Sequence, residues 1–190
     1  GSADRLEVRP IDVEDLLGRP QANLDKPAMK HLIAGKRVLI TGAGGTIGSE
    51  LTRQVSDLEP DLLILTDNSE FNLYSIDLEI SHRKPNQNRS MRLANVQEKS
   101  QMEAIFSEFK PELVFHAAAL KHVPIVENHP CEGVLTNVEG SRVVADLCSL
   151  HSVNGMVLIS TDKAVRPTNI MGATKRFAEL ILQAHSSERA

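Results

Sequence analysis

A strand, a glycine-rich turn and a helix follow one another without a break between Val38 and Leu51, and this stretch constrains the fold most. The apolar residues Val38-Leu39-Ile40 precede the turn, whose glycines fall in the pattern Gly42-x-x-Gly45-x-x-Gly48. After the turn, apolar residues recur at helical spacing and predict a helix with one buried face: Ile47, Leu51, Val55 and Leu58.

This order of elements suits the pyrophosphate group of a nucleotide. Glycines let the backbone approach the phosphates, and the first N–H groups of the helix point at the phosphate oxygens. The spacing differs from the commonest dinucleotide pattern, G-x-G-x-x-G, and a tight turn can need glycine without any ligand. The position of the turn between strand and helix favours nucleotide binding. We therefore expect five residues to contact a cofactor: Gly42, Gly45, Thr46, Ile47 and Gly48.

Composition narrows the classes of protein to consider. The 190 residues suffice for one domain, and 41% of them are hydrophobic, enough for a sizeable core. A net charge of −4 and 3% aromatic residues argue against nucleic-acid binding. Cys131 and Cys148 lack a C-x-x-C spacing and fit a reducing compartment, and no apolar run approaches the ~20 residues of a membrane span. Gly1-Ser2 resembles the remnant of an expression tag, so we expect a piece of a longer protein.

The chain divides into a lead-in over residues 1–35 and a dinucleotide-binding domain over 36–190. Short helices are expected at 11–18 and 27–34, the second ending at Gly35. From residue 36 strands and helices alternate, which predicts an α/β fold, a Rossmann-like doubly wound parallel sheet of strand order 3-2-1-4-5. The expected strands are 37–41, 61–66, 89–93, 112–116 and 155–160, and the expected helices are 46–58, 69–82, 98–109, 130–150 and 169–185. Such sheets usually continue to a sixth strand, so we expect the domain to be incomplete before the substrate-binding part.

Asp67 closes the second strand, 25 positions after Gly42. A carboxylate there can accept both ribose hydroxyls of an adenosine, and no Arg beside it would neutralise a 2′-phosphate, which favours NAD over NADP. An ordinary turn or N-cap aspartate is the alternative, and both roles are compatible. Further along, Asn95 and Val96 follow the third strand, where the adenine would lie.

The fourth strand ends in His116 and three alanines, Ala117, Ala118 and Ala119, which leave room for a dinucleotide. Close packing alone would also explain these small residues. The three histidines His116, His122 and His129 lack metal-ligand spacing, so we expect no metal site.

The fifth strand leads into Thr161-Asp162-Lys163, and Lys175 follows on the next helix. A hydroxyl, a carboxyl and an amine at the ligand-binding edge of the sheet can act as proton donors and acceptors. Elsewhere, adjacent Asp and Lys would usually be a solvated pair.

Together these motifs resemble the extended short-chain dehydrogenase/reductase family. The resemblance rests on Thr41-Gly42-x-x-Gly45-x-x-Gly48, His116-Ala117-Ala118-Ala119, Asn137 in Thr-Asn-Val-Glu-Gly, and Ser160-Thr161-Asp162-Lys163. Residues 119–124 and 160–175 are similar to its polysaccharide-biosynthesis branch, the UDP-N-acetylglucosamine 4,6-dehydratases. Residues 13–19 resemble the linker of long members, which follows a membrane-embedded segment.

The resemblance implies an NAD-dependent lyase of bacterial surface polysaccharide synthesis that acts on a UDP-N-acetylhexosamine. NAD would oxidise sugar carbon 4, Lys163 would take the proton on carbon 5, Asp162 would protonate the departing hydroxyl at carbon 6, and hydride would return there. Lys175 would orient the nicotinamide ribose, Asn137 would contact the cofactor, and Lys121 and His122 would contact the substrate. A homo-oligomer on the cytoplasmic face of the inner membrane is expected, its anchor lying outside this sequence.

One position departs from the family pattern. The Tyr-x-x-x-Lys of most members is Met171-x-x-x-Lys175 here, as in the long dehydratases, and a thioether cannot exchange a proton. Thr161 is the nearest candidate in sequence to replace the tyrosine. Three alternatives stay open: a UDP-sugar 4-epimerase, a dehydratase that inverts carbon 5, and an idle NAD-binding module. We expect the isolated fragment to be inactive.

Overall fold

A computed structural model describes residues 25–187, and residues 1–24, including the helix expected at 11–18, lie outside the described part. Five parallel strands form one sheet in the order β3-β2-β1-β4-β5, as predicted. The strands are β1 (Arg37–Thr41), β2 (Leu62–Asp67), β3 (Arg89–Leu93), β4 (Leu113–His116) and β5 (Gly155–Leu158). The helices are α2 (Lys26–Ile33), α3 (Thr46–Asp57), α4 (Glu70–Arg83), α5 (Lys99–Phe109), α6 (Val123–Asn128), α7 (Pro130–Gly133), η1 (Val134–Glu139), α8 (Gly140–Leu150), η2 (Asp162–Ala164) and α9 (Ile170–Ser187).

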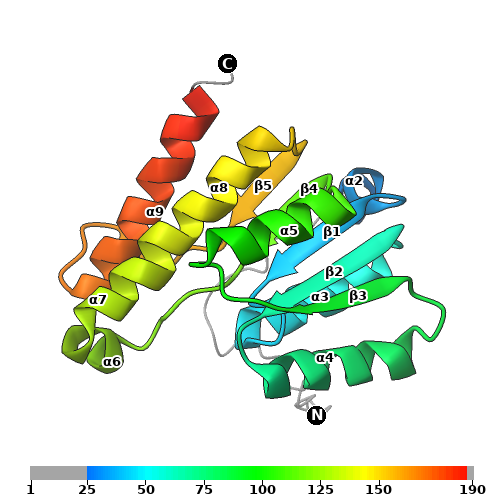
Figure 1. The fold of residues 1–190 in the computed structure, drawn as a ribbon, viewed down its shortest axis with the longest axis horizontal. Coiled ribbons are helices and arrows are strands. Elements are labelled where there is room, and N and C mark those ends of the chain that lie inside the picture. Colours follow the sequence, from blue (N-terminus) through cyan, green and yellow to red (C-terminus); the bar gives the residue numbers. More distant parts are fainter. Residues whose placement is uncertain (1–24, 188–190) are drawn as a thin grey trace, which may run out of the picture.

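Helices cover both faces of the sheet, so the core has two halves (Figure 1). Alternate residues of one strand enter different halves. Leu39 packs among side chains of α5 and α8, whereas Val38 and Ile40 pack among those of α2, α3 and α4. The central strands β1 and β2 are buried on both sides, which explains their nearly continuous apolar sequences.

The strand β5 has one neighbour among the described strands, and Val157 is 45% exposed. One sequence-based expectation needs correction. The helix expected over 130–150 is interrupted: η1 is a π-helical stretch between α7 and α8. A wider turn of this kind rotates the side chains that follow it and is common at functional sites. In addition, α6 was not predicted, because its six residues are too few for a periodic pattern.

The glycine-rich turn depends on two very close backbone approaches. Gly42 has φ +64°, and a Cβ there would lie 2.7 Å from the backbone of Ala118 at the end of β4. A Cβ on Gly48 would lie 1.8 Å from the carbonyl oxygen of Gly42. The first turn of α3 is therefore packed directly on the end of β1, and only glycine fits at both positions.

This packing predicts the effect of Gly48→Ala on stability. The added methyl group must push α3 away from the turn, so we expect the free energy of unfolding to fall by about 3 kcal/mol. Gly155→Ala is the matched control, because its new Cβ would meet Leu113 at an ordinary 3.4 Å. Urea unfolding of both variants tests the prediction, which fails if the two have the same midpoint.

Candidate functional site

The start of α3 presents free backbone donors to the edge of the sheet. Gly45 is the N-cap residue in an extended conformation, and no side chain caps the helix. The Ser49 N–H donates to the Gly45 carbonyl at 2.8 Å, which leaves the N–H groups of Thr46, Ile47 and Gly48 without an acceptor in their own helix. This arrangement is suited to an anion because the positive end of the helix dipole lies at the same place.

Two adjoining grooves run along the carboxyl ends of the strands. The first has a volume of about 190 Å³ and the second about 340 Å³, and they share Gly45, Ala117 and Ala119. The first is also lined by Gly42, Thr66, Asp67, Asn68, Asn72, Ala94, Asn95, Val96, Ala118, Leu120 and Thr136. The second is also lined by Thr46, Ile47, Gly48, Lys121, Ile159, Ser160, Thr161, Lys163, Met171 and Lys175. Nearly all residues predicted to contact a cofactor thus border one continuous depression.

Asp67 lies in the first groove and is 5% exposed. Its carboxylate accepts the Gly44 N–H at 3.0 Å and the Ser69 N–H at 2.9 Å. It is not the N-cap of α4, a role that Ser69 fills by accepting the Asn72 N–H. Each carboxylate oxygen keeps a further lone pair for a ligand hydroxyl.

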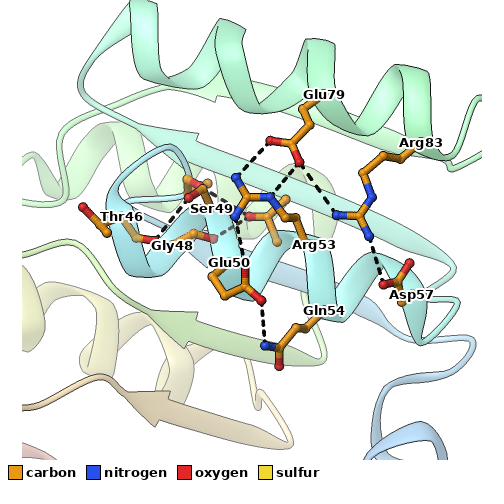
Figure 2. A network of polar contacts seen from close by, with 11 residues as sticks. Thr46, Gly48, Ser49, Glu50, Arg53, Gln54, Asp57, Glu79 and Arg83 are labelled. Carbon is orange, nitrogen blue, oxygen red and sulfur yellow. Dashed lines mark hydrogen bonds and ion pairs between the residues drawn. The ribbon is translucent and has the colours of Figure 1, made fainter. Parts of the chain in front are cut away.

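An ion-pair network joins α3 to α4, the helix that contributes Asn72 to this groove (Figure 2). Arg53 donates to both carboxylate oxygens of Glu79, at 2.6 and 3.0 Å, and also to Glu50 at 2.9 Å. Arg83 lies beside Glu79 and Asp57, at 3.7 and 3.2 Å. The hydrogen bond from Arg53 lowers the pKa of Glu79. Exposed pairs contribute little individually, but the two-pronged Arg53–Glu79 contact fixes the relative orientation of the two helices.

Lys175 is the buried cation of the second groove. Its ammonium group donates to the Ile159 carbonyl at 2.6 Å, and the residue is 6% exposed. Burial lowers its pKa to about 8, because the charged form loses hydration. Met171, one helical turn earlier on α9, is 2% exposed and also lines the groove.

The Thr161-Asp162-Lys163 triplet divides between the groove and solvent. Thr161 and Lys163 line the second groove, whereas the Asp162 side chain does not line it and is 88% exposed. The Thr161 hydroxyl donates to the Asp162 carboxylate at 3.0 Å, and the Lys163 ammonium lies 3.7 Å from it. The Thr161 hydrogen bond, followed by the Lys163 charge, lowers the Asp162 pKa. Asp162 is therefore ionised here, whereas the acid role expected for it requires the protonated form.

Asn137, which the resemblance predicts to contact the cofactor, holds backbone groups of the loop after β4 in the structure. It is 1% exposed and borders neither groove. Its amide accepts the Leu120 N–H at 2.8 Å and donates to the Leu120 carbonyl and the Thr174 hydroxyl, both at 2.9 Å. The π-helical stretch η1 aims it there. Asn137 thus ties the loop after β4 to α9 and positions the groove floor indirectly.

The histidines take the roles of structural or surface residues. His116 is fully buried between the hydroxyls of Thr41 and Ser141, at 2.6 and 3.1 Å. His122 is exposed at the start of α6 and borders neither groove, so the structure gives no support for its expected substrate contact. Lys121 does line the second groove and reaches the Thr46 hydroxyl at 3.1 Å. Within residues 25–187 no cluster of His, Cys, Asp and Glu could hold a metal ion.

Several lining residues were missed from the sequence. Asn68 and Asn72 flank the start of α4, and the backbone of Asn72 lies so close to Gly44 that a Cβ there would come within 2.4 Å. Their positions one and five residues after Asp67 could have indicated them. Thr136 gave no such signal, because the wider turn of η1 decides where it points.

Comparison with known proteins places this site in a family. A family model described as polysaccharide biosynthesis protein matches residues 38–190. The chain belongs to the polysaccharide-biosynthesis branch of the extended short-chain dehydrogenases/reductases.

Three relatives illustrate this membership. The capsular polysaccharide biosynthesis protein CapD of Staphylococcus aureus is 41% identical over 100% of this chain and 32% of its own length. A UDP-N-acetylglucosamine 4,6-dehydratase (inverting) of Campylobacter jejuni is 31% identical over 79% of this chain and 43% of its own. The crystal structure of a Thermotoga maritima UDP-glucose 4-epimerase with UDP-glucose superposes with a TM-score of 0.68 at 25% identity, covering 80% of this chain and 51% of that one. The chain therefore spans between about a third and a half of the length of these relatives.

The buried His116 predicts how acid affects stability. Burial lowers its pKa from 6.5 to about 3, so the unfolded chain takes up a proton first as the pH falls. Stability is fully present above pH 6.5 and is lost toward pH 3, by up to about 1.4 kcal/mol per pH unit. Urea unfolding between pH 7 and 5, above the range where carboxylates titrate, measures this slope.

Two variants test whether His116 causes this pH dependence of the free energy of unfolding. His116→Gln removes the titrating group and should flatten the pH dependence over this range, whereas His129→Gln, at an exposed position, should retain it. An unchanged slope in His116→Gln would show that another group is responsible.

Proposed function

We propose that this chain is the dinucleotide-binding part of an NAD-dependent 4,6-dehydratase acting on a UDP-N-acetylhexosamine. The observation that carries the proposal is that Thr161, Lys163 and Lys175 line a groove continuous with the glycine-rich turn. The similarity to a UDP-N-acetylglucosamine 4,6-dehydratase supports it further.

The residues present fit a nicotinamide dinucleotide. A Cβ at Gly42 or Gly48 would collide with the backbone, and the N–H groups at the start of α3 have no helical acceptor. Gly45, Thr46 and Ile47 would hold the pyrophosphate, Asp67 the adenosine ribose, and Asn95 and Val96 the adenine edge. Lys175 would hold the nicotinamide ribose. When bound, the coenzyme supplies hydride acceptance from sugar carbon 4 and hydride return at carbon 6.

The elimination step is assigned to the triplet after β5. A ketone at carbon 4 acidifies the carbon-5 proton, which Lys163 would accept through its Nζ. The carbon 6 hydroxyl leaves as water after protonation by Asp162. Asp162 is ionised when exposed, so the substrate has to bury it and raise its pKa before it can donate. One proton is thus taken up by Lys163 and one is released by Asp162.

Met171 leaves the deprotonation of the carbon-4 hydroxyl to another group. The Thr161 hydroxyl lines the same groove and donates to Asp162, so a proton could pass from the sugar through Thr161 to this carboxylate. Because Met171 is buried and unable to exchange protons, we assign it a packing role beside the nicotinamide.

A UDP-sugar 4-epimerase is the second candidate, favoured by the likeness to the Thermotoga enzyme. Epimerisation uses the same hydride transfer but has no need of an acid and base for elimination. Inversion at carbon 5 would be a variant of the dehydratase. The remaining alternative is a catalytically inactive NAD-binding module, which the methionine at position 171 favours.

Self-association and a membrane anchor remain predictions. An apolar groove between η1 and α9, with Val134 at 47% and Phe177 at 58% exposure, supports a contact with another copy. In the described part of the chain no helix combines the length and apolar character that crossing a bilayer requires. The linker that suggested an anchor lies in residues 13–19, outside the described range.

The reaction is tested with the full-length protein and UDP-N-acetylglucosamine in deuterated water. A dehydratase gives a 4-keto-6-deoxy product that has lost one water and carries deuterium at carbon 5. Mass spectrometry separates it from an epimerised product, whose mass is unchanged. Lys163→Met should lower kcat by at least about 10³-fold while NAD stays bound, because no base remains at carbon 5. Lys99→Met, at an exposed position on α5, is the control and should keep full activity.

Coenzyme selection is tested at Asp67. Asp67→Asn removes the charged acceptor, so we expect NAD affinity to fall about tenfold and the preference over NADP to shrink. Because the carboxylate also supports the turn through Gly44 and Ser69, unfolding is measured alongside calorimetric NAD binding. Asp61→Asn, on the opposite edge of the sheet, serves as the charge-matched control. Unaltered NAD affinity in Asp67→Asn would remove the ribose assignment.

A further inference from the structure

The ligand edge of the sheet is cationic although the chain as a whole has a net charge of −4. Lys121, Lys163 and Lys175 line the second groove, and Arg166 follows Lys163 by three residues on the same loop. Lys163 lies beside Asp162, and Lys175 binds a carbonyl. Arg166, in contrast, forms no ion pair or hydrogen bond with any residue in the range 25–187, and it is exposed.

The backbone of Arg166 is in an unfavourable conformation. Its φ is +49°, in the left-handed region that favours glycine and asparagine. Glu59, Lys110 and Ser152 also have positive φ, but each lies at the end of a full α-helix, where such a residue is an ordinary cap. Arg166 instead follows the single turn η2 and precedes Pro167, and a following proline disfavours helical conformations.

The loop that carries Arg166 is held in place by packing and by a backbone hydrogen bond. Ala164 is 1% exposed, the Val165 N–H donates to the Asp162 carbonyl at 3.0 Å, and Pro167 fixes the next φ. Gly172 on α9 packs against the Lys163 carbonyl, where a Cβ would come within 2.3 Å. Glycine or asparagine would adopt this turn at lower free energy. What arginine adds is a guanidinium group with five free donors, three residues after Lys163 on the loop that carries the triplet.

We propose that Arg166 binds the diphosphate of the nucleotide sugar and selects for a substrate that carries one, an inference that rests on the proposed function. In a pyranose, carbon 5 and the carbon that bears the diphosphate are bonded to the same ring oxygen. A sugar whose carbon 5 faces Lys163 therefore has its diphosphate one ring away, toward the rim of the groove. The planar guanidinium can donate two parallel hydrogen bonds to phosphate oxygens. The coenzyme pyrophosphate has its own donors at α3, so it does not need Arg166.

The test compares Arg166→Asn, Arg166→Lys and wild type in the full-length protein. Asparagine tolerates the left-handed conformation but lacks the charge, so Arg166→Asn should raise KM for UDP-N-acetylglucosamine about tenfold, with kcat and NAD affinity unchanged. Arg166→Lys should lie between the two. The affinity for UDP as an inhibitor should fall in parallel, whereas that for uridine should stay constant. Lys110→Asn, at another exposed cation with positive φ, should alter none of these quantities.

Each contrary result has a distinct meaning. Unchanged KM and UDP affinity in Arg166→Asn would overturn the proposal, and so would an equal loss of uridine affinity, which would place Arg166 at the base. A loss of NAD affinity would assign it to the coenzyme and also overturn it. If wild type binds UDP in an Arg166-dependent manner but turns over no UDP-sugar, the diphosphate assignment stands and the proposed function fails. Unfolding midpoints of Arg166→Asn equal to or above wild type show that the effects do not arise from loss of folding.

Discussion

The close approach between the glycine-rich turn and the end of β4 sets the geometry on which every other feature of the site depends. Gly42 lies against Ala118, and Gly48 lies against Gly42, so α3 starts at the level of the sheet edge. The free N–H groups of its first turn consequently lie beside the alanine floor of both grooves. A side chain at either glycine would move the helix away and would separate its free N–H groups from the rest of the groove.

Beneath this contact, a network of hydrogen bonds among buried polar side chains holds the strands and helices in register. Thr41 at the end of β1 binds His116 of β4, and His116 in turn binds Ser141 on α8. The Ser141 hydroxyl donates to the Asn137 carbonyl at 2.6 Å. Each polar side chain in this network has a hydrogen-bond partner, and for that reason the neutral form of His116 can be buried. The buried histidine lowers the free energy of unfolding only in acid, where the unfolded protein binds a proton at His116 and the folded protein does not.

Asn137 connects this buried hydrogen-bond network to the residues that border the groove. By holding both backbone groups of Leu120 and the hydroxyl of Thr174, it links the floor loop to the helix that bears Lys175. Lys175 is then buried enough for its pKa to fall to about 8. The triplet Thr161-Asp162-Lys163 is much less enclosed, and Asp162 faces solvent. The two ends of the second groove therefore differ in enclosure: Lys175 is buried, whereas the side chains of Asp162 and Lys163 are exposed.

The sequence by itself determined the alternation of strands and helices, the strand order, the nucleotide-binding turn and most residues that border the grooves. These follow from local patterns, since apolar periodicity and glycine placement act within a few residues, and parallel strands bring their carboxyl ends together. Only the tertiary structure decided the roles of Asn137, Asp162 and β5. Asn137 binds Leu120 and Thr174, the Asp162 side chain stays exposed, and β5 pairs with β4 alone among the described strands. Each outcome depends on how elements distant in sequence pack together, which no local pattern encodes.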